Sequence, residues 1–248
     1  MAKKGRPKER QAREQKPLPP PLPPETRTVG QLVAESIRLY GRRFWHSLAL
    51  GAGPAVVGVV SSFLGRTPAI ALLTAAGALA MAISYVGASI IVSEKRPTRR
   101  TLVAATAAGF IVYLPVPYLT LLLVLPAVAW LAFFGLAVPA AVIEGLGVRD
   151  AFRRGIELGK ADFVHAAGSL AALVVVVFLT GSVMSVLLHG GSGQAVRVAA
   201  FLASFVVTPL LFLGAALLYY DQAARVSSPP TARKRRRGAH VPDAVDPH

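Results

Sequence analysis

Apolar residues in this chain gather in long runs that charged residues separate. The longest run, Thr101–Ile143, spans 43 residues and contains no Asp, Glu, Lys, Arg or His. About 20 apolar helical residues cross the ~30 Å hydrocarbon core of a bilayer, so this run is long enough for two crossings. The pattern predicts an all-α polytopic membrane protein with six transmembrane helices arranged as three hairpins. The other four predicted crossings are Phe44–Leu64, Pro68–Val92, Phe163–Leu188 and Val198–Tyr220.

The two crossings inside the longest run need a turn, and its prolines offer two positions for one. We place the turn near Pro126, which gives two segments of ordinary length. Pro115 and Pro117 would then kink the third helix, and neighbouring helices can bind the backbone carbonyls that the prolines leave free. A turn between Pro115 and Pro117 is the alternative, and it leaves a third crossing of about 17 residues, at the lower limit for a span.

Two segments show helical amphipathic periodicity, and both are expected at the cytoplasmic interface. The first begins at Thr28, which lies three residues before Gln31 with the spacing of a capping box. The second is Val148–Lys160, whose apolar residues recur at i, i+4 and i+8. A helix with one apolar and one basic face is typical of a membrane surface. The second helix also has two opposite-charge pairs at i,i+4 spacing, Asp150–Arg154 and Arg153–Glu157.

The sequence around these two segments is partly repeated. Ile, Leu, Phe and His recur at a constant offset of 119 residues between Ile37–His46 and Ile156–His165. Each predicted hairpin also ends at an acidic residue, which is Glu94, Glu144 or Asp221. These features favour a parallel repeat of one hairpin unit. Chance similarity between two amphipathic helices is the alternative.

Composition supports this class and separates the membrane domain from its tails. The 248 residues are 54% hydrophobic and 16% charged, below the roughly 25% charged residues of soluble domains. We expect residues 1–27 and 226–248 to be disordered basic tails, which leaves 28–225 as the membrane domain. The run Pro17–Pro24 predicts a polyproline II rod, which is either a spacer or a binding segment for a protein partner.

The placement of charge predicts the orientation. Six crossings leave 25 of the 27 Lys and Arg residues on one side, and Arg66 and Arg197 on the other. The positive-inside rule then puts both termini in the cytoplasm of a multi-pass plasma-membrane protein. The net charge of +15 alone could suggest nucleic acid. We do not expect that partner, because no folded or aromatic surface accompanies the basic tail at Arg233–Arg237.

The basic clusters are the feature with an expected ligand. Anionic headgroups attract each cation near the cytoplasmic surface by ~1 kcal/mol. This attraction can be general, or it can form a specific phospholipid site between the two amphipathic helices. The residues expected to contact anionic lipid are Arg42, Arg43, Arg99, Arg100, Arg153 and Arg154.

The sequence offers no arrangement for catalysis, a metal or a cofactor, and we expect none of these. Its predicted spans hold no Asp, Glu, Lys or Arg except Arg197 at an edge, which counts against ion-coupled transport. His46 and His165 occupy equivalent positions of the repeat, with no Cys or carboxylate at ligand spacing. We interpret both as interfacial residues, with metal binding or pH sensing as the alternative.

Several segments together resemble a known membrane domain. The amphipathic segment Val29–Trp45, the turn at Leu125-Pro126, the exit Ala137–Gly145 and the helix Asp150–Leu158 resemble the membrane domain linked to glycerophosphoryl diester phosphodiesterases and its stand-alone bacterial relatives. The resemblance covers about residues 28–225 and implies a six-helix module in a bacterial plasma membrane. It implies no enzymatic activity, because the catalytic barrel is missing and the chain has no His-Arg-Gly motif.

Two functions are consistent with these patterns. We expect a non-enzymatic membrane scaffold or envelope-homeostasis component that contacts anionic lipid. The alternative is a transport or permeation component for an apolar or amphiphilic small molecule. Permeation requires a cavity lined by Ser, Thr or Tyr that reaches the bilayer midplane, whereas a scaffold requires a solid bundle.

Overall fold

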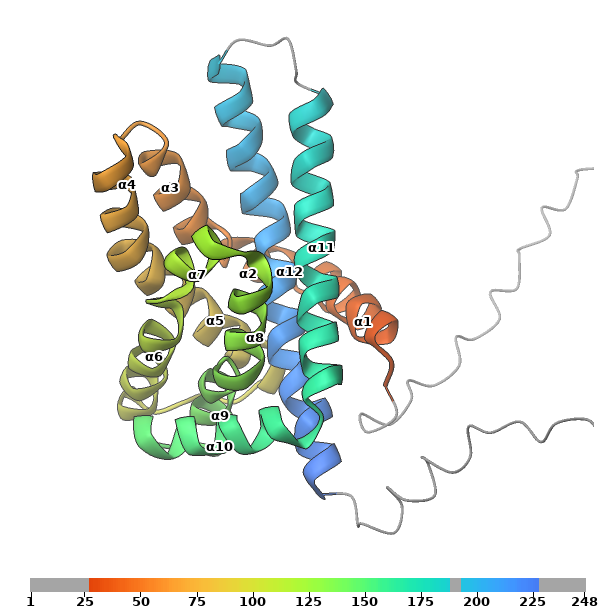
Figure 1. Ribbon diagram of the computed structural model, residues 1–248. Helices are drawn as coiled ribbons and strands as arrows, with labels where there is room; N and C mark the ends of the chain where they lie inside the picture. Colours follow the sequence, from red (N-terminus) through yellow and green to blue (C-terminus); the bar gives the residue numbers. More distant parts are fainter. Residues whose placement is uncertain (1–26, 188–192, 228–248) are drawn as a thin grey trace, which may run out of the picture.

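The protein, described by a computed structural model over residues 27–187 and 193–227, is built from helices within those ranges (Figure 1). Six segments are long and apolar enough to cross a membrane, which confirms the predicted all-α polytopic class. The tails, with the proline run, and the glycine-rich turn after Leu187 lie outside the described residues. The six spans are Phe44–Ser61, Arg66–Ser93, Arg99–Leu122, Val124–Glu144, Phe163–Thr180 and Phe201–Ser227.

The first hairpin contains two interrupted helices. Its first span is divided into α2 (Phe44–Ala49) and α3 (Ala52–Ser61). Its returning span begins with α4 (Arg66–Leu72), passes through a π-helical turn (Leu73–Gly77) and continues as α5 (Ala78–Ser93). The short connection between α3 and α4 lies at the upper end of the molecule in Figure 1.

The second hairpin turns close to the expected position. It contains α6 (Arg99–Tyr113), α7 (Val116–Leu122), α8 (Val124–Phe134) and α9 (Ala137–Glu144). The chain reverses at Leu123, where the backbone is extended with φ −167° and ψ 155°. The turn therefore lies three residues before the proline at which we placed it.

The two prolines at the other predicted position produce a kink. Pro115 separates α6 from α7, because a proline nitrogen cannot donate the helical hydrogen bond. The Nε1 of Trp130 in α8 donates to the carbonyl oxygen of Val112 at 2.9 Å. A neighbouring helix thus binds a carbonyl at the kink, as the bilayer interior requires.

The third hairpin supplies the longest helix and joins the other two hairpins. It consists of α11 (Phe163–Leu187) and the 35-residue α12 (Gly193–Ser227), which packs against α3, α5 and α11. Three buried rings, Tyr85 of α5, Tyr113 of α6 and Phe212 of α12, have centroids 6.1 to 6.3 Å apart. One helix from each hairpin therefore meets the others in this aromatic cluster, where edge-on and tilted packing is favourable.

The amphipathic helices α1 (Val29–Arg42) and α10 (Val148–Ala161) form as predicted. Thr28 caps α1, and both hydrogen bonds of its capping box with Gln31 are present. Each helix packs on a hairpin other than the one it leads into. α1 lies against α11 and α12, whereas α10 lies against α8 and α9, across the lower end of the bundle in Figure 1.

The offset of 119 residues recurs in the structure. Both amphipathic helices contain 14 residues, and their first residues are 119 positions apart. Leu32 and Ser36 are the buried residues of α1. The residues 119 positions after them are Ala151 and Gly155, and both are buried in α10. The two helices therefore bury corresponding faces, which supports the interpretation as a repeat.

Two glycines let α10 approach the membrane helices closely. An added Cβ at Gly155 would lie 2.7 Å from the backbone nitrogen of Ala137 in α9. An added Cβ at Gly159 would lie 2.8 Å from the carbonyl oxygen of Ala132 in α8. Side chains at either position would push backbone away, so this contact depends on the two glycines.

We predict that Gly155→Ala destabilises the protein. Forcing a methyl group into a closely packed contact costs about 1–3 kcal/mol. Gly168→Ala in α11 is the matched control, because nothing lies within 4 Å of an added Cβ there. Thermal unfolding in detergent, followed by circular dichroism, should show a lower Tm for Gly155→Ala and no decrease for Gly168→Ala. Equal Tm values for the two variants would contradict the described contact.

Candidate functional site

Polar contacts connect the acidic ends of the three hairpins to arginines. Glu94 ends α5 in the left-handed conformation with φ 55°. Its carboxylate binds Arg43, which lies between α1 and α2, at 2.5 Å. Both side chains are largely exposed, so this pair contributes little to stability. We call the region formed by the α5–α6 loop, α10, the last turns of α12 and α1, which lies beside α11 and α12 above the level of α10 in Figure 1, the basic end.

The second hairpin ends in a more enclosed pair. The Oε1 atom of Glu144 accepts hydrogen bonds from Arg154 Nε at 2.9 Å and from the Tyr219 hydroxyl at 2.5 Å. Arg154 also binds Glu157 at 3.0 Å. The hydrogen bond to Glu144 raises the pKa of the Arg154 guanidinium above its ordinary value. This carboxylate therefore ties α10 and α12 to the end of α9.

The two ion pairs expected within α10 are replaced by these contacts. The predictions of Asp150–Arg154 and Arg153–Glu157 at i,i+4 are wrong, because Arg154 binds Glu144 and Glu157 instead. The Glu144 side chain is 29% exposed and also accepts a hydrogen bond from the Tyr219 hydroxyl. A less hydrated carboxylate attracts a guanidinium more strongly.

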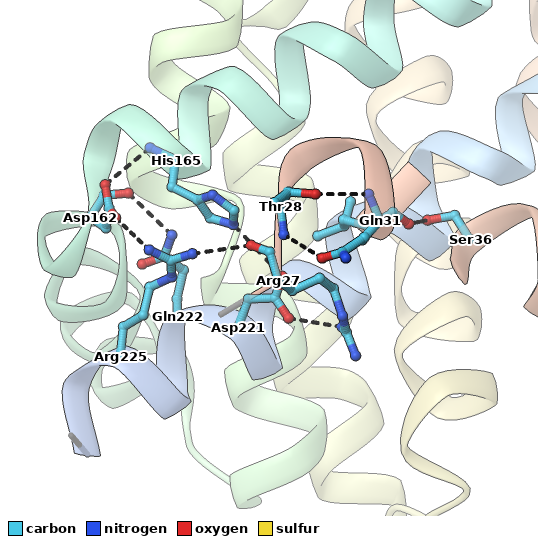
Figure 2. A network of polar contacts seen from close by, with 10 residues as sticks. Arg27, Thr28, Gln31, Ser36, Asp162, His165, Asp221, Gln222 and Arg225 are labelled. Atoms are coloured by element: carbon cyan, nitrogen blue, oxygen red, sulfur yellow. Dashed lines mark hydrogen bonds and ion pairs between the residues drawn. The ribbon is translucent and has the colours of Figure 1, made fainter. Parts of the chain in front are cut away.

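The acidic residue of the third hairpin is fully buried and lies six residues before the end of α12. Asp221 of α12 has no exposed side-chain surface and binds Arg27 Nη1 at 2.8 Å (Figure 2). His165 Nε2 of α11 lies 3.7 Å from the other carboxylate oxygen. The Arg27 side chain is 14% exposed and that of His165 is 10% exposed. The pair therefore holds the chain before α1 against the last hairpin, in an environment with little water.

A second carboxylate extends this contact. Asp162 accepts a hydrogen bond from the backbone nitrogen of His165 at 3.1 Å and binds Arg225 at 2.6 Å. Arg225 also donates to the carbonyl oxygen of Arg27 at 3.4 Å, and Gln222 donates to the carbonyl oxygen of Asp162 at 3.1 Å. Figure 2 shows these side chains converging from α11, α12 and the start of α1. The group acts as a polar clamp on three elements.

Several buried atoms of this clamp lack a hydrogen-bond partner within the described residues. They are His165 Nε2, Asp221 Oδ2, Gln222 Oε1 and Arg225 Nε. Buried polar atoms normally have a protein or water partner. With two arginines facing two aspartates, formal charge is balanced when the histidine is neutral, so the clamp can hold its elements together without a net buried charge.

The two histidines of the sequence repeat have different environments. His46 in α2 is exposed, as expected for an interfacial residue. His165 is nearly buried, and its carboxylate neighbour comes from α12, 56 residues further along the chain. Sequence spacing could not reveal this neighbour. The structure does not reproduce the equivalence of the two positions.

The structure divides the six predicted lipid-contacting arginines into two groups. Arg43 and Arg154 bind carboxylates. Arg42, Arg99, Arg100 and Arg153 are exposed. Within the described residues of the basic end, six of seven carboxylates form ion pairs with Arg or His. The cations there that form no ion pair are Arg42, Lys95, Arg96, Arg99, Arg100, Arg149, Arg153 and Lys160.

The centre of the bundle holds a small, mostly apolar cavity. Its volume is about 20 Å³, and its lining includes Tyr85, Tyr113, Leu136 and Leu170. That volume is close to the minimum for one water molecule. The central packing is therefore nearly complete where α5, α6, α8, α11 and α12 meet.

No family model, no curated protein and no solved structure matches the chain in comparisons with known proteins. Its function is therefore inferred from its own residues and geometry.

We predict that the buried pair stabilises the protein more than the exposed pair. Arg27→Gln leaves the Asp221 carboxylate buried without its cation, which costs ~3–5 kcal/mol. Arg43→Gln removes the same charge from an exposed pair, which costs about 0–1 kcal/mol. Thermal unfolding in detergent should give a clearly lower Tm for Arg27→Gln than for Arg43→Gln. A similar Tm for the two variants would contradict the assigned role of the clamp.

Proposed function

We propose that this chain is a non-enzymatic scaffold of a bacterial plasma membrane that contacts anionic lipid and contributes to envelope homeostasis. The observation that carries the proposal is the surplus of cations at the basic end. Among the described residues there, eight Lys and Arg side chains form no ion pair, whereas six of seven carboxylates are already paired. The surface therefore presents positive charge that the protein itself does not neutralise.

The positions of these cations favour lipid as their partner. Arg99 and Arg100 begin the third span, and Arg42 lies just before the first. Cations at such depths face the headgroup layer, where anionic lipids attract each by ~1 kcal/mol. Arg153 belongs to α10, whose opposite face is packed on the bundle. The basic end is thus suited to a flat anionic surface.

The same charges support an orientation. We assign the basic end to the cytoplasmic side, because the positive-inside rule places loops rich in Lys and Arg there. Both tails adjoin this end, so both termini are cytoplasmic in the proposal. The Pro-rich segment Pro17–Pro24 would then be available to a cytoplasmic protein partner.

The interior favours a scaffold over a permeation pathway. A route for an amphiphile needs a polar-lined cavity across the midplane, and the central cavity of about 20 Å³ is near the minimum for a single water. The resemblance to the membrane domain of glycerophosphoryl diester phosphodiesterases, noted from Ala137–Gly145 and Asp150–Leu158, supports the same proposal. In that interpretation residues 28–225 form a membrane module.

We predict that neutralising the exposed arginines removes the preference for anionic lipid. Trp45 is a natural reporter, because its side chain is 76% exposed and it lies two residues after Arg43. In nanodiscs, energy transfer from tryptophan to dansyl-labelled phosphatidylglycerol should exceed transfer to dansyl-labelled phosphatidylcholine. The quadruple variant with Arg42, Arg99, Arg100 and Arg153 changed to Gln should lose most of this difference, because each cation contributes ~1 kcal/mol.

Two controls make this measurement specific. The Trp45→Phe variant gives the background from Trp130, which is partly buried and donates a hydrogen bond to the carbonyl oxygen of Val112. Arg66→Gln removes one cation from the opposite end and should leave the preference unchanged. An unchanged preference for phosphatidylglycerol in the quadruple variant would contradict the proposed function.

A further inference from the structure

A groove opens between α3 and α12 at the end opposite the basic end. The two helices touch near the start of α3, where an added Cβ at Gly51 would lie 2.0 Å from the carbonyl oxygen of Phe205. Seven residues further along α3, nothing lies within 4 Å of an added Cβ at Gly58. The helices therefore diverge from a close contact, and the space between them reaches about 180 Å³.

The α3 side of this groove changes from apolar to polar toward its open end, and the α12 side carries Arg197 at the open end and Ser204 near the close contact. One row of residues from each helix forms the lining. The residues of the α3 row are spaced at i, i+3, i+4 and i+7, and those of the α12 row at i, i+4 and i+7. Each row therefore lies on one face of its helix. Its polar groups are one guanidinium and two serine hydroxyls. The lining residues are Ala55, Gly58, Val59, Ser62, Arg197, Phe201 and Ser204.

The cation at this groove has no acidic partner among the described residues. The guanidinium carbon of Arg197 lies 4.7 Å from the centre of the Phe63 ring, a cation–π distance. Arg197 is exposed, and its contact with the ring fixes the charge without neutralising it. The groove thus presents a positioned positive charge on the side of the membrane where cations are few.

The depth of the groove matches the headgroup layer. The first span ends at Ser61, and the apolar residues of α12 begin at Val198, directly after Arg197. The groove therefore crosses the boundary of the apolar region, and Arg197 lies at that boundary. A lipid phosphodiester lies at this depth, with its acyl chains directed toward the apolar wall of the groove.

We propose that the groove between α3 and α12 binds the headgroup of one anionic phospholipid. Arg197 binds the phosphodiester, Ser62 is a hydrogen-bonding partner at the rim, and Ala55, Gly58 and Val59 receive the adjoining part of an acyl chain. This site is separate from the basic end. The two sites also bind lipid differently. The groove uses a single cation and a defined shape, whereas the basic end presents a broad positive surface.

The test is photo-cross-linking with a localised readout. Protein in nanodiscs receives phosphatidylglycerol with a diazirine in its acyl chain, and the cross-linked residues are mapped by mass spectrometry. We expect cross-links in α3 and in α12 near Phe201. Arg197→Gln should reduce these cross-links about fivefold, the effect of removing one headgroup attraction. Cross-links at the basic end should not change.

Two variants and two probe comparisons separate the proposal from its alternatives. Arg66→Gln removes the other cation of this end and should leave the groove cross-links unchanged. Gly58→Leu keeps Arg197 but fills the groove, and it should abolish them without lowering the Tm. The proposal is overturned if Arg66→Gln and Arg197→Gln have equal effects, or if Gly58→Leu leaves the cross-links intact. It is also overturned if diazirine-labelled phosphatidylcholine cross-links equally well, or if millimolar inorganic phosphate displaces phosphatidylglycerol.

Discussion

The buried ion pair between Arg27 and Asp221 is the interaction on which the arrangement of the basic end depends. Charges removed from water are costly unless they are paired and hydrogen-bonded. This pair joins residues 194 positions apart, so it connects the beginning of the helical region to its last helix. Glu144 has the same effect in a half-buried setting, where Arg154 and Tyr219 bind it from α10 and α12. These contacts fix the positions of the elements relative to one another at the basic end.

The two ends of the bundle consequently differ in construction. At the basic end, ion pairs hold the amphipathic helices in place, and the remaining cations face outward. At the opposite end, α3 and α12 separate beyond Gly51, and the groove between them carries one positioned cation, Arg197. The central aromatic cluster connects the hairpins between these ends. The interior is nearly solid there, with a central cavity of about 20 Å³.

Much of the fold could be predicted from the sequence, because membrane spans are specified by local properties. Run length predicts the six spans, and the cap at Thr28 needs residues only three positions apart. The partners of charged groups could not be predicted, since Arg27 and Asp221 are 194 positions apart in the sequence and only tertiary packing brings them together. His165 illustrates the same limit. The sequence repeat assigns it the role of His46, but its neighbours from α12 place it in a buried clamp.

Cysteine accessibility tests the central claim that all three hairpins end on one side of the membrane. The chain contains no native cysteine, so single substitutions can be labelled without background. Ala34→Cys in α1, Asp150→Cys in α10 and Thr67→Cys in the first turn of α4 all replace exposed residues. With a membrane-impermeant maleimide on intact cells, the account predicts labelling at position 67 alone, and labelling at 34 and 150 only after permeabilisation. Labelling of position 34 or 150 from outside the cell would contradict it.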